Sequence, residues 1–209
     1  MPRRVLCLLA VLMLCVVLPV CAEESGTAAE GWPGLEGSET GGTLGLEMTA
    51  FGEEDLHFSG FFYPELQPET LPGIPEKVII DNGDGSYVMC CVEEGWEAVF
   101  ACDAEGGNAR ILSFTLLDGS MEGPRGVRIG DQFHEDFQRF RSGENEMTED
   151  MTEVLYGTED TVPRGLANYW PGEMTLRYVT ETETGMQVEL VLQYENTTLS
   201  DIVVRTIED

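Results

Sequence analysis

Two groups of three short runs of alternating apolar and polar residues constrain this chain more than any other feature of its 209 residues. Alternation with a period of two is typical of half-buried strands, and turns containing glycine or asparagine separate the runs. The runs span residues 87–92, 96–102 and 110–117 in the first group, and residues 176–180, 186–194 and 199–207 in the second. Successive strands joined by such short turns pair antiparallel, so the sequence predicts two β-meanders.

The two groups align without gaps at an offset of 90 residues, which places Gly95 on Gly185 and Phe100 on Leu190. An internal repeat explains this match. The patterning that any two three-stranded meanders share explains it as well, because few aligned residues are identical. Both explanations stay open, and any repeat is partial, because residues 41–51 hold no counterpart of the helix expected at residues 131–141.

That helix lies between the two groups of strands. Phe133, Phe137 and Phe140 recur at i, i+4 and i+7, which gives an otherwise charged helix one aromatic stripe. Asp131 is placed to cap its first turn. The predicted fold class is therefore α+β, with antiparallel hairpins and meanders and one principal helix, at about residues 131–141, that covers the sheet.

Strand patterns also precede the first group. Residues 44–51 and 56–63 alternate and predict a hairpin, and residues 78–80 predict a further short strand. The acidic stretch Asp81–Ser86 follows, but the spacing of its oxygen-bearing side chains does not match that of a helix-flanked calcium loop. Its Asn-Gly and Asp-Gly pairs favour a hairpin turn.

The first 22 residues have the pattern of a secretory signal peptide. Arg3 and Arg4 precede an apolar run, and the residues up to Ala22 fit a cleavage site. Cys21 offers a second interpretation, because LPVC at residues 18–21 resembles the motif at which bacterial lipoproteins are lipidated. Both interpretations predict an extracytoplasmic protein, and cleavage and secretion are favoured over lipidation at Cys21.

The remaining chain divides at about residue 44. Residues 23–43 are rich in Gly, Glu, Ser and Thr and predict a flexible acidic linker, because they hold few side chains that can form a core. Residues 44–209 form the expected α+β domain. Its two groups of strands leave open a division into two β-rich halves, residues 44–122 and 123–209.

Acidic residues dominate the composition. Loss of residues 1–22 removes two of the 11 Lys and Arg residues, so that 9 basic residues remain beside 39 acidic ones, a formal charge of −30. Nucleic acids and anionic membranes attract lysine and arginine, so neither is an expected partner, and membrane contact is expected only through a lipid anchor. An acidic surface keeps a protein soluble and attracts cations or basic partners.

Three cysteines follow the signal peptide: Cys90, Cys91 and Cys102. Outside the cytoplasm, a disulfide is the usual state of a close pair. Cys102 is expected on the strand after the one that holds the other two, and neighbouring residues of a strand point to opposite faces. We therefore predict one disulfide, with Cys90 as the favoured partner of Cys102 and Cys91 as the alternative.

No set of residues predicts a catalytic centre, a metal site or a cofactor. His57 and His134 belong to no metal-ligand or nucleophile motif. His134, Glu135 and Asp136 are expected on a solvated face of the helix. A hydrolase that uses two carboxylates stays an alternative, because carboxylates are so abundant in this chain.

Aromatic side chains are the remaining candidates for a binding surface, because aromatics often anchor interfaces. The candidates are Trp32, Phe61, Phe62, Trp96 and Trp170. Packing in the core or at a sheet edge is the competing interpretation for each. The expected partner is a protein or a small ligand at the cell surface.

Three segments of the second half are similar to those of uncharacterised exported or lipoprotein-type proteins of gut-dwelling Gram-positive bacteria: GPRGVRIGD from residue 123, LYG from residue 155 and LRYVTETETG from residue 176. Residues 129–137 also resemble the start of the helix in outer-membrane-assembly lipoproteins of the SmpA/OmlA kind and in β-lactamase-inhibitor-like modules. In those proteins a helix packs on an antiparallel sheet. The resemblance covers residues 123–207 and implies an envelope location and a non-enzymatic scaffold.

Taken with the acidic composition, these patterns predict an exported, non-catalytic protein of the cell envelope or the extracellular space that binds an unknown partner. A passive structural subunit of an envelope assembly is the alternative. Neither expectation requires a cofactor.

Overall fold

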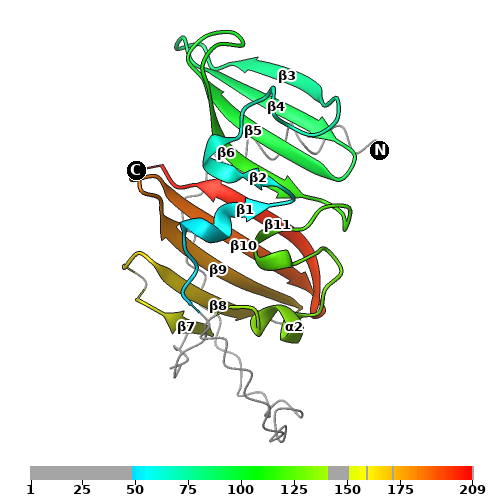
Figure 1. Cartoon of the computed structure of the whole chain (residues 1–209), viewed down its shortest axis with the longest axis vertical. Helices are drawn as coiled ribbons and strands as arrows, with labels where there is room; N and C mark the ends of the chain where they lie inside the picture. The colour runs from blue at the N-terminus through cyan, green and yellow to red at the C-terminus, as the bar shows by residue number, and fades with distance from the viewer. Residues whose placement is uncertain (1–48, 141–150, 159, 171, 209) are drawn as a thin grey trace, which may run out of the picture. The chain divides into compact units, whose positions relative to one another are not determined.

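A computed structural model describes residues 49–140, 151–158, 160–170 and 172–208. The predicted signal peptide with Cys21, and the predicted linker with Trp32, lie outside the described residues. Nine strands form one antiparallel sheet in the order β3-β4-β5-β6-β11-β10-β9-β8-β7 (Figure 1). The fold of the described residues is therefore mainly antiparallel β.

The first meander consists of β3 (Glu76–Asp81), β4 (Tyr87–Glu93), β5 (Trp96–Cys102) and β6 (Ala109–Leu116). The second meander consists of β7 (Thr152–Tyr156), β8 (Arg164–Trp170), β9 (Glu173–Glu181), β10 (Gln187–Glu195) and β11 (Thr198–Thr206). The other described elements are the strands β1 (His57–Phe58) and β2 (Phe61–Phe62), the 3-10 helices η2 (Glu53–Leu56), η3 (Tyr63–Glu65) and η4 (Pro124–Gly126), and the helix α2 (Phe133–Phe137).

The sheet follows the alternation in the sequence. Along β5 every second side chain from Trp96 to Cys102 is buried, and the side chains between them are half-buried. Along β10 the core residues from Val188 to Tyr194 alternate in the same way. Paired residues of neighbouring strands point to the same face, so these residues define the core face of the sheet.

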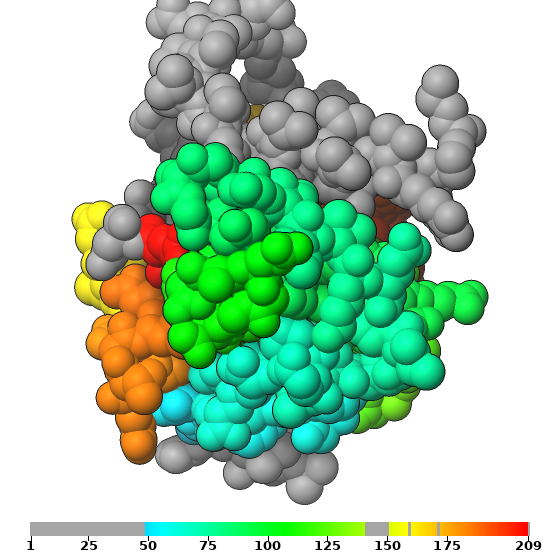
Figure 2. Space-filling model, turned by 90° about the horizontal axis from the view of Figure 1, so that it is seen from above, coloured from blue at the N-terminus to red at the C-terminus, as the bar shows by residue number. Residues whose placement is uncertain are grey.

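Two chain segments, one before and one after the first meander, cover the core face (Figure 1). Leu56, from the segment before the first meander, and Val127, from the segment after β6, join the core residues of the strands in one hydrophobic cluster. The hydroxyl of Tyr63 donates a hydrogen bond to the carbonyl oxygen of Leu112 at 2.9 Å. In Figure 2 the cyan residues of the first segment adjoin the green strands of the first meander. Burial of these apolar side chains is the main term that stabilises the fold.

The face opposite the core face, the outer face, is partly apolar and carries half-buried valines, among them the cross-strand pair Val191 and Val203. Glu189 points to the same face and is 2% exposed. Its two carboxylate oxygens accept hydrogen bonds from the Nε atoms of Arg177 at 2.8 Å and Arg205 at 2.6 Å. A buried carboxylate needs such partners, because its desolvation is costly.

Helix α2 is short: it spans Phe133–Phe137, whereas the sequence predicts a helix over residues 131–141. Asp131 does not cap its first turn. The Asp131 carboxylate instead accepts hydrogen bonds from the backbone N–H of Arg128 at 2.9 Å and from Arg139 at 3.1 Å. The helical part of the fold is thus smaller than the predicted α+β class implies.

The aromatic stripe predicted for this helix is only partly buried. Phe133 and Phe137 are half-buried and stack with 5.6 Å between their ring centroids. Phe140 lies beyond the helix, is 1% exposed and stacks on Tyr178 at 4.3 Å. Phe140 is therefore the best buried aromatic of the three.

Among the residues described, no helix has both the length and the apolar character needed to cross a membrane.

The hairpin predicted from residues 44–51 and 56–63 is much smaller in the structure. Its first run is described only from residue 49 onward, and residues 53–56 form the 3-10 helix η2. The pairing is limited to β1 and β2, with two residues in each strand. The strands predicted for the two meanders, in contrast, are confirmed by β4, β5 and β6 and by β9, β10 and β11.

The two β-rich halves share one sheet, because β6 and β11 pair with each other. The described residues belong to one compact unit. The 90-residue offset holds between β5 and β10, where Phe100 and Leu190 both face the core. It fails between β4 and β9, where the offset aligns Met89 with Val179. Met89 pairs with Phe100 and faces the core, whereas Val179 pairs with Glu189 and faces outward. The structure therefore contains no ungapped repeat of the whole meander.

Candidate interaction surface

The first strand of the large sheet, β3, has an open edge. β3 pairs with β4 on one side, and no described strand pairs with its other side. An edge of this kind presents unpaired backbone N–H and C=O groups to a further strand. Two apolar side chains of β3, Val78 and Ile79, are 40% and 41% exposed. They point to opposite faces of the strand, so an added strand would meet apolar surface on both faces.

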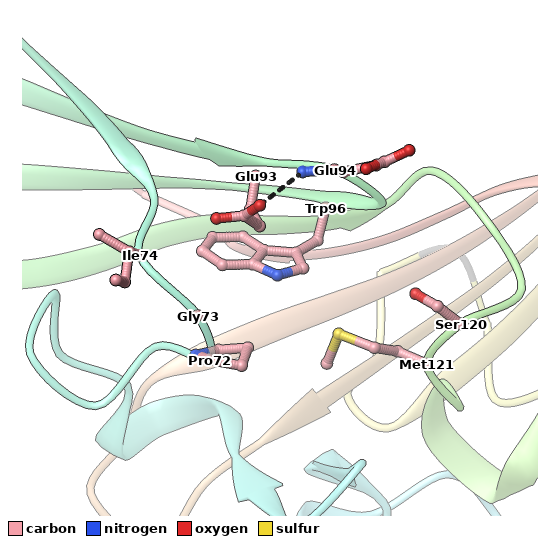
Figure 3. A pocket seen from close by; sticks show the side chains of 8 residues that line it. All are labelled: Pro72, Gly73, Ile74, Glu93, Glu94, Trp96, Ser120 and Met121. Atoms are coloured by element: carbon pink, nitrogen blue, oxygen red, sulfur yellow. Dashed lines mark hydrogen bonds between the residues drawn. The ribbon is translucent and has the colours of Figure 1, made fainter.

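A hollow adjoins β3 beside the turn between β4 and β5 (Figure 3). It has a volume of about 520 Å³. Its lining consists of Pro72, Gly73, Ile74, Glu93, Glu94, Trp96, Ser120 and Met121. Ile74 lies two residues before β3 and is 93% exposed, so it connects the hollow to the open edge.

Trp96 forms the closed floor of the hollow, since it lines the hollow but is only 3% exposed. Its ring stacks on Phe114 with 5.5 Å between centroids and 18° between the ring planes. Figure 3 shows the indole between Glu93 on one side and Pro72 and Met121 on the other. A rigid aromatic floor beside a carboxylate suits a side chain with an apolar stem and a positive end, as in lysine and arginine.

Carboxylates surround this site. Glu93 and Glu94 line the hollow, and the backbone N–H of Glu94 donates to the Glu93 carboxylate at 3.3 Å. The ends of β3 carry two more carboxylates, on Glu76 and Asp81, both exposed. Lys77 is the one basic residue of the strand. The edge and the hollow are therefore acidic and favour a partner of opposite charge.

The turn that positions Trp96 requires a glycine. Gly95 has a φ of +97°, which side chains disfavour. A Cβ at this position would also lie 2.6 Å from a carboxylate oxygen of Asp118. The carbonyl oxygen of Gly95 accepts a hydrogen bond from the backbone N–H of Leu117 at 2.8 Å. This contact fixes the end of the hairpin and thereby the start of β5.

The structure does not gather the predicted interaction aromatics in one place. Trp96 lines the hollow, whereas Phe61 and Phe62 are half-buried in β2. Trp170 ends β8 and is 59% exposed. Four strands separate β5 from β8 in the sheet, so Trp96 and Trp170 belong to strands roughly 24 Å apart, at about 4.8 Å for each step.

The predicted disulfide between Cys90 and Cys102 is not formed: Cys90, Cys91 and Cys102 are all free and buried. The strand register gives the reason. Cys102 lies opposite Tyr87, three residues from Cys90 and four from Cys91 along β4. Three residues of strand span about 10 Å, which exceeds the Cα separation of about 7 Å that a disulfide allows. Burial raises the pKa of each of the three thiols, which lowers their reactivity.

The side chains expected on a solvated face of the helix are divided between surface and interior. His134 and Glu135 are exposed, but Asp136 is 0% exposed. One oxygen of Asp136 accepts a hydrogen bond from the hydroxyl of Tyr194 at 3.0 Å. The other lies 3.5 Å from a guanidinium nitrogen of Arg139 and accepts no hydrogen bond. Burial raises the pKa of Asp136 to about 6, although the Tyr194 hydrogen bond opposes the shift. The three side chains do not share one site.

Within the ranges that the structure covers, no three His, Cys, Asp or Glu side chains gather closely enough to hold a metal ion. The predicted turn at Asp81–Ser86 joins β3 to β4, although Asp81 itself is the last residue of β3. The Asp81 carboxylate accepts a hydrogen bond from the backbone N–H of Gly83 at 2.7 Å, and Asp84 accepts one from Ser86 at 2.9 Å. The carboxylates of Asp81 and Asp84 thus accept hydrogen bonds from within this hairpin connection.

The sequence indicated Trp96 but not the surface around it. Ile74 and Met121 lie in irregular segments that carry no periodic pattern. The open edge of β3 follows from the order of strands in the sheet, and alternation within a strand does not specify that order. The exposure of Val78 and Ile79 could therefore not be predicted from the sequence.

No family model, curated protein or solved structure matches the chain. The resemblance to envelope proteins in the second half thus stays an expectation. What the protein binds is inferred below from its own surface.

Proposed function

We propose that the protein is an exported, non-catalytic binding protein that holds an extended, basic segment of a partner protein along the open edge of β3. One observation carries this proposal: the open edge of β3 lies beside an acidic hollow whose floor is Trp96. The secretory pattern of residues 1–22 supports export, either by secretion or with a lipid anchor at Cys21. The partner segment adds a tenth strand to the sheet.

Backbone groups supply the first part of the binding energy. An extended segment that pairs with an open edge gains main-chain hydrogen bonds, and pockets beside the edge select its side chains. Val78 and Ile79 give the added strand apolar contacts on both faces. The hollow then receives one side chain from the end of the added strand that lies near Ile74.

Charge selects a basic partner over a second copy of β3. In a centred antiparallel pair of two β3 strands, Glu76 of each copy would lie opposite Asp81 of the other. Like charges directly opposite each other destabilise a strand pair. A partner strand with lysine or arginine opposite Glu76 and Asp81 converts both repulsions into attractions. Lysine at the hollow adds contact with the carboxylate of Glu93.

Calorimetric titration with a synthetic octapeptide of alternating lysine and valine tests this proposal. We expect saturable binding that weakens as salt rises, because charge attraction contributes. An octapeptide of alternating glutamate and valine serves as the control and is expected not to bind. Hydrogen exchange then locates the peptide: the amides of β3 should gain protection, and those of β7, at the other end of the sheet, should not.

A pair of matched variants locates the charge effect. Glu93→Gln with Glu94→Gln should weaken binding of the basic peptide about tenfold, because both carboxylates line the hollow. Glu181→Gln with Glu183→Gln removes the same charge from two exposed residues, at the end of β9 and in the turn after it, and should leave binding nearly unchanged. Equal weakening by both double variants would show general charge attraction and refute a site at β3. Failure of the basic peptide to bind would favour the passive structural subunit.

A further inference from the structure

The one fully buried side chain of helix α2 is a carboxylate. Asp136 is 0% exposed, whereas Phe133 and Phe137 are half-buried and His134 and Glu135 are exposed. A helix that packs on a sheet normally buries apolar side chains, because a buried carboxylate is costly unless hydrogen-bond donors match its charge. How firmly α2 is held on the sheet therefore depends on the charge of Asp136 and on the donors around it.

The donors around Asp136 do not match a full negative charge. The hydroxyl of Tyr194, in β10, donates to one carboxylate oxygen at 3.0 Å, and the other oxygen accepts no hydrogen bond. The Nη1 atom of Arg139 lies 3.5 Å from that second oxygen. It donates instead to the carbonyl oxygen of Gly126 at 2.6 Å and to the carboxylate of Asp131 at 3.1 Å. These two bonds use both hydrogens of that nitrogen, so none is left for Asp136.

The other titratable groups near Asp136 do not compensate its charge either. Asp131 carries a second negative charge, and the two carboxylates share the one guanidinium of Arg139. The hydroxyl of Tyr178, in β9, makes no hydrogen bond and stays neutral, because burial raises its pKa well above the ordinary value. Burial raises the pKa of Asp136 to about 6, and the charge of Asp131 adds to this shift, although the hydrogen bond from Tyr194 opposes it. The docked helix therefore favours the protonated form of Asp136.

Contacts on both sides of α2 hold the neighbouring chain in place without using this charge. Before the helix, the backbone N–H of Leu199, in β11, donates to the carbonyl oxygen of Asp131 at 2.9 Å. After the helix, Phe140 stacks on Tyr178 with 4.3 Å between the ring centroids. A short segment between two such contacts can leave the sheet while the strands stay folded, as in the local unfolding of other proteins.

We infer that the charge of Asp136 controls a local opening of α2: the helix stays on the sheet while Asp136 is protonated and detaches more often once Asp136 is ionised. The opening exposes the carboxylate to water and uncovers Tyr194, which is 0% exposed when α2 is docked. This inference concerns the core face of the second meander and does not use the β3 edge.

The sign and the range of the pH effect follow from the two states. In the open state the pKa of Asp136 returns to about 3.9, so the docked helix binds the proton more tightly than the open one. The helix is held most firmly below about pH 4, and the hold weakens as pH rises to about 6. Above that pH it changes no further, because Asp136 is then ionised in both states. The equilibrium constant for opening should rise about fiftyfold between pH 4 and pH 7.

Hydrogen exchange at several pH values between about 4 and 7 tests the inference on the chain that follows residue 22. The backbone N–H groups of Asp136 and Arg139 report on α2, since they donate to the carbonyl oxygens of Gln132 at 3.1 Å and of Asp136 at 2.8 Å. After correction for the intrinsic exchange rate, their opening constant should rise about fiftyfold from pH 4 to pH 7. It should also exceed that of the β10 amides at every pH, because the strands stay folded.

Three substitutions in α2 assign the effect to one side chain. Asp136→Asn removes the titration, so the opening constant of α2 should vary less than threefold over this range. Glu135→Gln is the matched control, because it makes the same chemical change at an exposed residue of the same helix, and it should keep the pH dependence of the parent. His134→Gln should also keep it, which excludes the exposed histidine as the cause.

Tyr194→Phe gives an independent variant if Asp136→Asn does not fold by circular dichroism. It removes the donor that favours the ionised carboxylate, so the pKa of Asp136 should rise further and the increase in opening should extend to higher pH. An unchanged pH range for this variant would overturn the inference.

Three other results would overturn it as well: a rise in opening below tenfold in the parent, exchange of the α2 amides only together with those of β10, and the same pH dependence in Asp136→Asn and Glu135→Gln. None of these measurements involves a peptide at β3, so either proposal can fail without the other.

Discussion

Arg125 donates hydrogen bonds to both carboxylate oxygens of Asp55, from Nε at 2.8 Å and from Nη2 at 2.6 Å. The two residues are 70 positions apart, and each side chain is only 13% exposed. Arg125 also donates to the carbonyl oxygens of Ala50 and Arg139, each at 3.1 Å, and its guanidinium lies 5.1 Å from the ring centroid of Phe140. One side chain thus ties together the segments that cover the core face.

Replacement of Arg125 should destabilise the fold strongly. Arg125→Ala removes the guanidinium partner of the largely buried Asp55 carboxylate and leaves it only the backbone N–H of Gly52 among its described donors, and loss of a buried charge partner costs about 3–5 kcal/mol. Arg128→Ala is the matched control, because the Arg128–Glu122 pair is about half exposed and should contribute less than about 1 kcal/mol. Urea unfolding measures both values. A similar small loss for the two variants would contradict the anchoring role of Arg125.

Asp136→Asn should change how stability depends on pH. The pKa of Asp136 is about 6 in the folded protein and about 3.9 in an unfolded chain, so the folded state binds this proton more tightly. The contribution of Asp136 to the free energy of unfolding therefore falls as pH rises from about 4 to about 6, by up to about 3 kcal/mol.

The asparagine carries no titratable proton, so Asp136→Asn should be about 1–3 kcal/mol more stable than the parent near neutral pH and similar to it near pH 4. Urea unfolding of both proteins at several pH values between about 4 and 7 gives the difference. A difference that does not vary with pH would show that Asp136 does not titrate in this range.

Phe140→Ala should cost more stability than Phe137→Ala. Phe140 is 1% exposed and stacked on Tyr178, so its removal leaves a cavity and should cost about 3–5 kcal/mol. Phe137 is half-buried and should cost about 1–2 kcal/mol, because less apolar area is lost. Thermal or urea unfolding ranks the two variants. The opposite order would mean that α2, and not the segment after it, seals the core.

Thiol titration should find three free cysteines in the chain that follows residue 22. The structure leaves Cys90, Cys91 and Cys102 free. All three should react in denaturant without a reductant, and slowly in the native protein, because they are buried and the pKa of each thiol is raised. A count of one thiol in denaturant without reductant would show that two of the three cysteines form a disulfide.

The alternation in the sequence predicted six of the nine strands of the large sheet closely, and residues 78–80 marked β3. The runs whose strands were predicted correctly are rich in β-branched and aromatic residues, as at Val188 and Tyr194 of β10. β8 was not predicted, because Gly165 and Asn168 are weak strand formers and Pro163 precedes it. Pairing with β7 on one side and β9 on the other holds β8 in place despite this composition.

The helix and the cysteines were misjudged because tertiary contacts decide both. The spacing of Phe133 and Phe137 suggested a longer helix, but the chain leaves the helix after Phe137 and buries Phe140 against Tyr178. The pairing of Cys102 depended on strand register, which alternation alone does not specify. The candidate site was predictable only at Trp96, since its other parts come from the strand order and from irregular segments.

The seam between β6 and β11 consists of four residue pairs, against nine between β9 and β10. Every other neighbouring pair of strands in the sheet is also consecutive in the chain. Nearly all of the sheet is therefore built from contacts between nearby residues, which form quickly because little loop entropy is lost. During synthesis from the N-terminus, β3–β6 can therefore pair before β7 has been made. The pairing of β10 with β11 and the closing of the seam with β6 must wait for the last strand.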